Sequence, residues 1–294
     1  MTAGEALVEG AALLRSSGAD SPSLDASLLL CEVLGMTRAR LLSRRDAEID
    51  PENEAAYRSF LDRRKRGECL AYILGRKEFR GLDFLVSPAV LVPRPDTEIL
   101  VEAALEAIDA SSDRQTSGSP HSGVSLPYRV LDACTGSGCV AIAIKAERPQ
   151  VSVAACDLSP AALDVARANS ERLLGSGAVE FFLSDLLSDV RGTFDLIVSN
   201  PPYVPGAVID TLAAEVRREP RLALDGGEDG LDLIRRLARE SPARLGAKGR
   251  ILIESGPEQS PLVAELLRAQ AFVAVATWRD LAGRERVAGG MRGP

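Results

Sequence analysis

Strand-like and helix-like segments alternate through the second half of the chain, and this limits the possible folds more than any other feature. From residue 128 onward, short apolar runs typical of buried strands are separated by longer segments with apolar residues at helical spacing. Strands are expected near 129–133, 151–156, 179–183, 194–199, 250–254 and 271–277, and helices near 138–146, 160–173, 208–217, 230–244 and 259–269. The alternation predicts an α/β fold with a parallel, doubly wound sheet.

The first part of the chain has a different pattern. Residues 1 to about 75 repeat leucine and alanine at helical spacing, and Ser21-Pro22 and Asp50-Pro51 are typical helix starts, so we expect a small helical bundle. Two strand-like runs, at 79–86 and 89–92, predict a β-hairpin. The expected domains are therefore a helical domain at 1–75, a hairpin linker at 76–93 and an α/β domain at 94–294. Residues 111–127 are expected to form a low-complexity loop.

Composition argues against several kinds of protein. The chain has no uncharged apolar span long enough for a transmembrane helix, and its first residues, with Glu5 and Glu9, lack the basic region of a secretory signal. We therefore expect a cytoplasmic protein with no membrane partner, and no feature requires more than a monomer. The net charge of −7 argues against a nucleic-acid partner. Five cysteines without a CxxC pair and a single histidine, His121, argue against a disulfide framework, a metal site or a Ser-His-Asp triad.

A glycine-containing loop follows the strand at 129–133. Gly136 and Gly138 would let a ligand approach the backbone at the start of the next helix. Asp157 ends the following strand, about 20 residues further on, where a carboxylate can bind ribose hydroxyls. NAD enzymes share this layout, but GxGxxG is absent and few helix N–H groups would face a pyrophosphate. The loop therefore suits S-adenosylmethionine, which has no phosphate.

The segment Ser184-Asp185-Leu186 follows the strand at 179–183. An acid beside an apolar residue suits an adenine, because it offers one polar contact to the amino group and an apolar wall. Asp185 is equally suited to capping the next short turn.

Asn200-Pro201-Pro202-Tyr203 follows the apolar run 195–199. This places a carboxamide, backbone carbonyls and an aromatic ring at the carboxyl edge of the sheet, where open α/β sheets bind ligands. The arrangement suits methyl transfer to a planar nitrogen of an amide or of an exocyclic base amine, because acceptors can orient its N–H bonds while a ring stacks on the flat group. The alternative is an ordinary proline-rich turn.

Several motifs together point to a known family. They lie at 91–98, 130–138, 157–160, 200–203, 219–227 and 280–286. In this order, and over nearly the whole chain, they resemble those of the release-factor glutamine methyltransferases. Cys134 departs from the pattern, because many members have the first glycine of the loop at this position.

The resemblance implies a class I, Rossmann-like methyltransferase domain that uses S-adenosylmethionine. It also implies an acceptor, the side-chain amide of the Gly-Gly-Gln glutamine in class 1 peptide chain release factors, and an N-terminal helical domain that helps to bind the release factor. A sister family methylates a glutamine of a ribosomal protein and has Ser-Pro after Pro-Arg. The sequence Pro95-Asp96-Thr97-Glu98 favours the release-factor branch over that alternative.

The resemblance and the residue chemistry suggest the same roles. Asn200 is expected to accept one N–H of the glutamine amide, the Pro201 carbonyl to accept the other, and Tyr203 to pack on the amide. Pro202, Arg94 and Glu98 complete the expected substrate-binding set, although Arg94 and Glu98 are equally suited to a structural salt bridge. The expected cofactor-binding residues are Cys134, Thr135, Gly136, Ser137, Gly138, Asp157, Leu158, Asp185, Leu186 and Asn200. Neither a metal nor a general base is expected, since a methylated, protonated amide loses its proton unaided.

Two further functions remain possible at this point. An N6-adenine methyltransferase acting on RNA or DNA would share Asn200-Pro201-Pro202-Tyr203, because a flipped adenine also presents a planar amine. The acidic balance of the chain argues against it. A non-catalytic module could keep the cofactor fold, but the complete motif argues for an enzyme.

Overall fold

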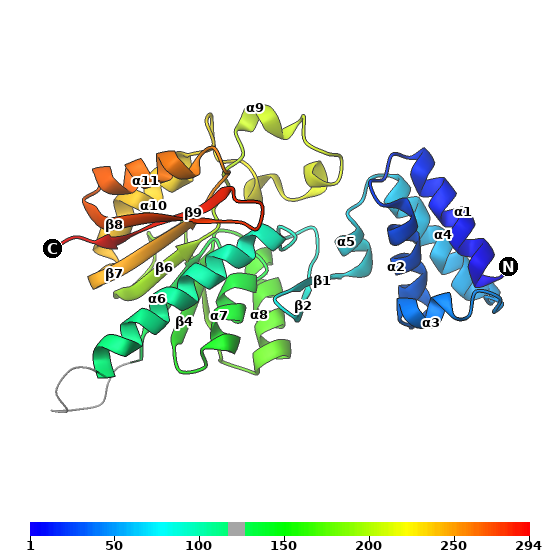
Figure 1. The fold of residues 1–294 in the computed structure, drawn as a ribbon, viewed down its shortest axis with the longest axis horizontal. Coiled ribbons are helices and arrows are strands. Elements are labelled where there is room, and N and C mark those ends of the chain that lie inside the picture. The colour runs from blue at the N-terminus through cyan, green and yellow to red at the C-terminus, as the bar shows by residue number, and fades with distance from the viewer. Residues whose placement is uncertain (117–126) are drawn as a thin grey trace. The chain divides into compact units, whose positions relative to one another are not determined.

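The computed structural model describes residues 1–116 and 127–294, which form two compact units (Figure 1). One unit comprises residues 1–76 and 212–218, and the other comprises 77–211 and 219–294. The segment 212–218, which the predicted boundaries place in the α/β domain, belongs to the helical unit in the structure. Residues 117–126, which include His121 and most of the expected loop, lie outside the described part of the chain.

The helical unit contains five helices in its first 76 residues. They are α1 (Ala3–Ser16), α2 (Pro22–Leu34), α3 (Arg38–Leu42), α4 (Pro51–Lys65) and α5 (Leu70–Leu74). Thr2 and Glu5 form a capping box at the start of α1, and a proline begins both α2 and α4. Gly35 ends α2 in the left-handed conformation that glycine adopts at low cost. Local capping signals thus explain where these helices begin and end.

Two buried polar side chains tie this unit together. The Tyr57 hydroxyl on α4 donates to the carbonyls of Ala6 and Ala26 at 3.3 and 3.2 Å, so it links α4 to α1 and α2. Arg64, also on α4, pairs with Asp25 at 2.8 Å and with Glu215. The second ion pair attaches the segment 212–218 to the helices, which explains why this distant stretch of sequence belongs to the unit.

A two-stranded sheet follows the helices, with β1 at Arg76–Phe79 and β2 at Leu82–Leu85. Its turn lies at Arg80-Gly81, where φ is +50° and +75°. Positive φ at both central residues matches the twist of a tight hairpin. The prediction that the strands lie at 79–86 and 89–92 was therefore wrong in position, because residues 80–81 form the turn and 89–92 are not a strand.

The larger unit contains a seven-stranded sheet in the order β5-β4-β3-β6-β7-β9-β8. The strands are β3 (Arg129–Ala133), β4 (Ser152–Asp157), β5 (Glu180–Leu183), β6 (Phe194–Ser199), β7 (Leu245–Glu254), β8 (Phe272–Arg279) and β9 (Glu285–Arg292). The first five strands of the order pair in parallel, and β9 pairs antiparallel with both β7 and β8. The parallel pairing brings the ends of β3, β4, β5 and β6 to one edge of the sheet.

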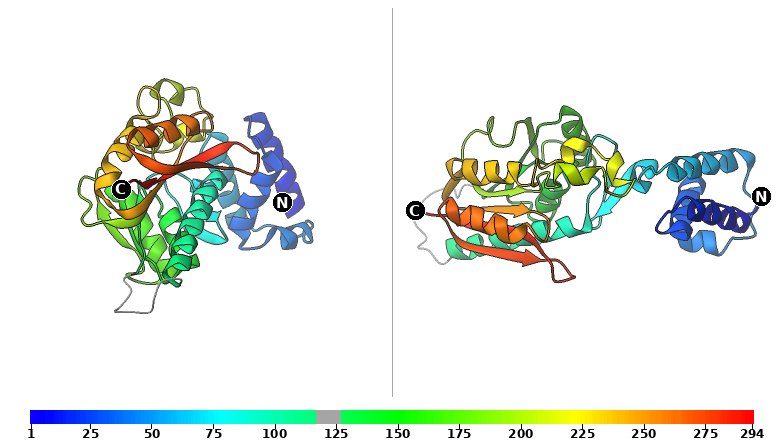
Figure 2. Two further views of the ribbon diagram at one scale, coloured as in Figure 1. Left: turned by 60° about the vertical axis from the view of Figure 1, so that its left-hand side comes forward. Right: turned by 90° about the horizontal axis from the view of Figure 1, so that it is seen from above.

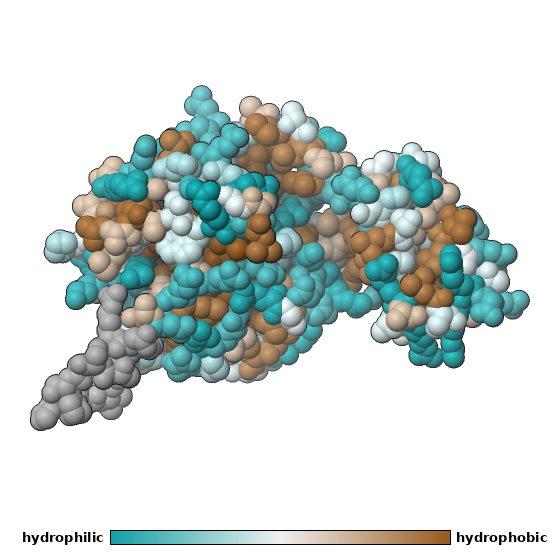
Figure 3. Space-filling view, viewed as in Figure 1, coloured by the Kyte–Doolittle hydropathy of each residue, from teal (hydrophilic) through white to brown (hydrophobic). Residues whose placement is uncertain are grey.

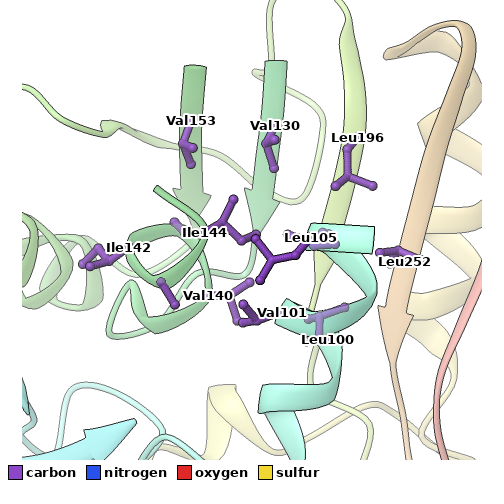
Figure 4. Packing of buried hydrophobic residues seen from close by; sticks show 14 of the residues in the cluster. Leu100, Val101, Leu105, Val130, Val140, Ile142, Ile144, Val153, Leu196 and Leu252 are labelled. Carbon is purple, nitrogen blue, oxygen red and sulfur yellow. The ribbon is translucent and has the colours of Figure 1, made fainter. Parts of the chain in front are cut away.

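Helices cover both faces of this sheet (Figures 1 and 2). On one face lie α6 (Glu98–Thr116), α7 (Cys139–Glu147) and α8 (Pro160–Leu174), and on the other lie α10 (Asp232–Glu240) and α11 (Ser260–Ala269). In Figure 4, Leu105 of α6 and Ile144 of α7 pack toward Val130 of β3 and Leu196 of β6. The α/β fold class predicted from the alternating pattern is confirmed.

Three elements of the chain differ from the prediction. The expected helix at 208–217 is reduced to α9 (Gly206–Ile209) and a 3-10 turn at Val216–Arg218, and α10 ends at Glu240, with a separate 3-10 turn at Ser241–Ala243. A further 3-10 turn spans Arg221–Ala223. Helix α6 continues to Thr116, into the segment 111–127 that was expected to be a loop, because no glycine or proline interrupts the chain there.

Strand β9 was not predicted, because its two glycines are unusual in a strand. An ideal Cβ at Gly289 would lie 2.4 Å from Leu252 Cδ2, and one at Gly290 would lie 3.0 Å from Phe272 Cβ. The glycines therefore let β9 fit between its neighbours.

The surface of the molecule mixes polar and apolar residues. On the face seen in Figure 3, hydrophobic residues are interspersed with hydrophilic ones. Within the described ranges, the structure contains no helix with the length and apolar character needed to span a membrane.

Candidate active site

A cavity of about 1050 Å³, including its open mouth, lies in the larger unit. Its walls come from the segments that follow β3, β4, β5 and β6, together with parts of 89–97 and 220–233. Among the predicted cofactor residues, those that line it are Cys134, Thr135, Gly136, Ser137, Asp157, Leu158, Asp185, Leu186 and Asn200. Gly138 does not line the cavity. Of the predicted substrate residues, Arg94, Asn200 and Pro202 line it, and Glu98, Pro201 and Tyr203 do not.

The loop between β3 and α7 folds through three left-handed residues. The φ angles of Cys134, Gly136 and Gly138 are +62°, +54° and +81°. An ideal Cβ at Gly138 would lie 3.0 Å from Ile142 Cδ1 and 3.2 Å from Ala166 Cβ, so this glycine also lets the loop pack against α7 and α8. Cys134 adopts the left-handed region at a cost of about 1 kcal/mol. The conformation explains why a glycine suits this position.

The side chain of Asp132, at the end of β3, lies at the N-terminus of α7. Its Oδ2 accepts hydrogen bonds from Thr135 Oγ1 at 2.6 Å and from the Ala141 N–H at 3.2 Å. Burial raises the pKa of Asp132 to about 7. The Gly138 N–H donates to the Thr135 carbonyl at 2.8 Å. Groups of the protein itself thus engage these amides, which suits a ligand without a phosphate at this helix.

Asp157 ends β4 and is held by the backbone. Its Oδ2 accepts the Gly136 N–H and its Oδ1 accepts the Ser159 N–H, both at 2.9 Å. Burial raises the pKa of this carboxyl. Each carboxylate oxygen can accept a second hydrogen bond. The geometry therefore fits a ligand with two neighbouring hydroxyl groups, such as a ribose.

Asp185 has a partner that sequence reasoning did not identify. Its two carboxylate oxygens accept hydrogen bonds from Arg236 Nη1 and Nη2 of α10, each at 3.0 Å. The backbone carbonyl of Asp185, rather than its side chain, accepts the Ser188 hydroxyl of the following turn. Asp185 lines the cavity, and its carboxylate is fixed by Arg236. An adenine amino group in the cavity would therefore donate to a carboxylate that already accepts hydrogen bonds from Arg236.

Asn200 follows β6 and is oriented by a neighbouring hydroxyl. Its Nδ2 donates to Thr97 Oγ1 at 3.1 Å, and Thr97 Oγ1 donates to Glu254 Oε1 at 3.1 Å. Thr97 lies in the 3-10 turn Pro95–Thr97, and Glu254 ends β7. Because Nδ2 is turned toward Thr97, the carboxamide oxygen is the branch left for the cavity.

The turn Asn200-Pro201-Pro202-Tyr203 is held by the segment 224–230. An ideal Cβ at Gly226 would lie 2.8 Å from the Pro202 carbonyl oxygen, and one at Gly230 would lie 2.2 Å from that of Tyr203. The Tyr203 carbonyl accepts Gln259 Nε2 at 3.0 Å, and its ring packs on the core beneath α10 and α11. Burial raises the pKa of the Tyr203 phenol to about 12. The ring is therefore largely buried against the core, and Tyr203 is not among the residues that line the cavity.

Arg94 and Glu98 differ in their surroundings. Arg94 lines the cavity and forms an ion pair with Glu219, whose other oxygen accepts the Val92 N–H at 3.0 Å. Glu98 accepts the Arg80 N–H at 3.3 Å at the turn between β1 and β2. The structure thus gives Arg94 a salt bridge at the cavity and places Glu98 outside the lining.

Four side chains around this site were missed as functional candidates. They are Thr97, Glu219, Arg236 and Glu254. Thr97 and Glu219 lie in motifs that the sequence analysis noted, so their positions were available as a signal. Arg236 and Glu254 belong to an ordinary amphipathic helix and an ordinary buried strand, and only the tertiary structure brings them to Asp185 and Thr97.

The fold and the cavity define a class I methyltransferase that uses S-adenosylmethionine. The fixed Asp157 carboxylate suits the ribose of this cofactor, and Leu158 and Leu186 offer apolar contacts in the same cavity. Comparisons with known proteins agree. Residues 5–75 match the family model described as the PrmC N-terminal domain, and residues 121–228 match the methyltransferase small domain.

Curated relatives show which family the chain belongs to. Proteins named release factor glutamine methyltransferase from Moorella thermoacetica and Geobacter sulfurreducens are each 40% identical to this chain. The alignments cover 97% and 95% of this chain, and 97% and 93% of the respective relatives. The chain belongs to the release factor glutamine methyltransferase family.

Solved structures agree on the fold. The hMettl16 catalytic domain, solved with a MAT2A 3′UTR hairpin, has a TM-score of 0.57 at 16% identity, over 76% of this chain and 80% of that chain. A methyltransferase from Pyrococcus furiosus has a TM-score of 0.50 at 20% identity, over 74% of this chain and 92% of that chain. At these identities the likeness concerns the fold alone.

Proposed function

We propose that the chain methylates the side-chain amide of the glutamine in the Gly-Gly-Gln motif of class 1 peptide chain release factors. The observation that carries this proposal is the orientation of Asn200 at the cavity, with its amino group engaged by Thr97 and its oxygen left as an acceptor. An acceptor at this point suits an amide N–H. The names of the relatives, which specify both release factor and glutamine, support the same substrate.

The residues of the cavity would act mainly by alignment. S-adenosylmethionine supplies an electrophilic methyl group when bound. Asp157 would hold its ribose hydroxyls, and Asn200 Oδ1 would accept one N–H of the glutamine amide. Pro201 does not line the cavity, so its carbonyl would accept the other N–H only after the turn adjusts to the bound substrate. Prolines have no N–H, so Pro201 and Pro202 stiffen the turn without adding a donor. Such orientation can contribute up to about 7–11 kcal/mol to lowering the barrier.

No side chain needs to remove the amide proton before transfer. The cofactor, held by Asp157, would supply the methyl group, and the glutamine nitrogen that receives it would carry a positive charge. A protonated amide is so acidic that its proton then passes to water. We infer that Arg94 and Pro202 contact the Gly-Gly-Gln loop, and that the helical unit contributes to binding the release factor.

The proposal is tested by transfer of labelled methyl from S-adenosylmethionine to a purified class 1 release factor. The matched control is the same factor with the Gly-Gly-Gln glutamine changed to alanine. We expect label on the unchanged factor and none on the control. Label on ribosomal protein or RNA, offered in parallel, with none on the release factor would overturn the proposed substrate.

A further inference from the structure

Three side chains form a hydrogen-bonded chain that begins at the cavity and ends in the core. Asn200 donates to Thr97, and Thr97 donates to Glu254, with both distances at 3.1 Å. Thr97 and Glu254 are 2% and 1% exposed, so water has little access to the bond between them, whereas the Asn200–Thr97 bond lies at the cavity wall. The three residues come from the ends of β6 and β7 and from the 3-10 turn before α6. Their arrangement is thus created by the fold and not by local sequence.

The direction of this chain decides what Asn200 presents to the cavity. A threonine hydroxyl has one proton, so when it donates to Glu254 its oxygen must accept from Asn200. The Asn200 amino group then faces Thr97, and Oδ1 is left for the substrate. If the chain ran the other way, Asn200 would offer N–H groups to the substrate N–H, and two donors would face each other.

Glu254 sets this direction at the buried end. An ionised carboxylate can only accept, so it forces Thr97 to donate, whereas a protonated carboxyl can donate and permits the reverse order. Burial raises the pKa of Glu254 to about 8, so both forms are accessible near neutral pH. The charged and titratable groups that face it are Arg94, Asp96, Cys139, Tyr203 and Arg286. Among the described residues, its Oε2 has no hydrogen-bond partner.

We propose that Thr97 and Glu254 are positioning residues that fix the orientation of the Asn200 carboxamide, with ionised Glu254 as the terminal acceptor. This inference rests on the proposed function, in which Asn200 Oδ1 accepts a substrate N–H. Glu254 does not line the cavity, and Thr97, which does, has its hydroxyl engaged by Asn200 and Glu254. Both act through Asn200, so they affect how often its oxygen faces the substrate and leave Asp157 and the glycine loop unchanged.

The hydrogen-bonded relay formed by Asn200, Thr97 and Glu254 can be observed without any substrate. The side-chain amide resonances of Asn200 are measured by ¹⁵N NMR in the whole protein and assigned by their loss in Asn200→Asp. We expect them to shift with pH as Glu254 titrates, and this shift to vanish in Glu254→Gln. In Thr97→Val, which keeps the shape but removes the hydroxyl, the hydrogen-bonded shift is lost at every pH. If the Asn200 resonances are unchanged in both variants, the proposed relay is wrong.

Turnover provides the second measurement. Thr97→Val is expected to lower kcat by about 10- to 100-fold, since a misaligned acceptor loses much of the benefit of orientation. Thr97→Ser keeps the hydroxyl and should restore most of the loss, while S-adenosylmethionine affinity stays within about twofold in both. Ser260→Ala is the matched control, because Ser260 is fully buried and its hydroxyl has no partner in the described part of the chain.

The pH dependence of kcat distinguishes a positioning role of Glu254 from a role in stability alone. In the parent protein, kcat should rise as Glu254 ionises, and in Glu254→Gln this rise should be absent, because a neutral carboxamide does not titrate. Thermal unfolding of each variant checks the fold. If Thr97→Val does not fold, the pH profiles of Thr97→Ser and Glu254→Gln still test the proposal. Only Glu254→Gln should lose the rise in kcat. A parent-like rise in Glu254→Gln would contradict the proposal.

Failure of the inference and failure of the proposed function give different results. If the Asn200 resonances follow Thr97 and Glu254 but no release factor is methylated, the relay stands and the substrate is wrong. If the factor is methylated while Thr97→Val keeps parent resonances and parent kcat, the substrate stands and the relay is wrong.

Discussion

At the scale of single residues, the site depends on a few side chains whose freedom the structure removes. Asp157 is fixed by two backbone N–H groups, Asp185 by Arg236, and Asn200 by Thr97. Each faces the cavity with its hydrogen-bonding direction already set. Preorganised groups of this kind stabilise a transition state more than mobile groups do, because little has to be reordered during the reaction.

The first prediction concerns Asn200 itself. Asn200→Ala removes the acceptor for the substrate N–H but leaves Asp157 and the glycine loop intact, so kcat should fall by about 100-fold while S-adenosylmethionine affinity changes little. Steady-state kinetics and isothermal titration calorimetry measure the two quantities. Unchanged turnover in this variant would show that Asn200 does not orient the substrate.

A second prediction concerns the pH dependence of stability. Burial raises the pKa of Glu254 to about 8 from an unfolded value of 4.5, so the folded state binds this proton more tightly. The resulting stabilisation is present below the unfolded pKa and is lost as pH rises through the folded pKa. Relative to Glu254→Gln, the parent should lose unfolding free energy between about pH 5 and 9. Chemical denaturation across this range measures it, and exposed Glu258→Gln is the control.

At the scale of elements, the Asn200–Tyr203 turn is shaped by a segment that lies beside it in space. Residues 204 and 225 form a parallel bridge, and glycines at 226 and 230 allow their backbone to approach the carbonyls of Pro202 and Tyr203. Gly226, within the 219–227 motif, and Gly230, just beyond it, therefore have a packing reason. The turn and this segment should respond together to a substitution in either one.

Gly230→Ala tests this packing. Its Cβ would lie 2.2 Å from the Tyr203 carbonyl oxygen, so the turn must shift, and we expect a loss of at least about 2 kcal/mol in stability together with reduced turnover. Gly177→Ala is the matched control, because Gly177 also has a positive φ, +75°, but an added Cβ meets nothing within 4 Å. Equal destabilisation of the two variants in urea titrations would mean that only backbone strain, and not the contact, matters.

At the scale of the whole molecule, the fold class and the cavity were predictable because they depend on local signals repeated along the chain. Buried strands, helical spacing and the residues that end β3, β4 and β6 are all readable from sequence, and the parallel sheet brings those ends together. Other features depend on distant contacts. The Thr97–Glu254 bond joins residues 157 positions apart, and Arg64 holds Glu215 across 151 positions. Local periodicity carries no signal for such pairs.

The same distinction explains the errors in element assignment. Strand β9 contains two glycines that only its neighbours require, and residues 212–218 leave the α/β unit because of a buried arginine in another helix. The segment 89–92 has strand-like composition, but the backbone N–H of Val92 bonds to Glu219. In each case a tertiary contact overrides the local preference.

The 212–218 segment gives a prediction at this scale. Arg64→Ala leaves the Asp25 carboxylate buried without its partner and frees Glu215, so the helical unit should lose about 3–5 kcal/mol of stability. Proteolysis should then cut within 212–218 faster than in the parent. Arg58→Ala, which removes exposed ion pairs on the same helix, is the control and should change little. Parent-like protection in Arg64→Ala would show that this arginine does not hold the segment.

We propose that Asn200 in this cavity orients the Gly-Gly-Gln glutamine of a release factor for methylation. The most direct measurement is mass spectrometry of the Gly-Gly-Gln peptide after a class 1 release factor is incubated with S-adenosylmethionine and either the parent protein or Asn200→Ala. We expect one added methyl group, located on the glutamine side chain, with the parent and almost none with the variant. An unmodified glutamine with the parent protein, or a methyl group on another residue, would contradict it.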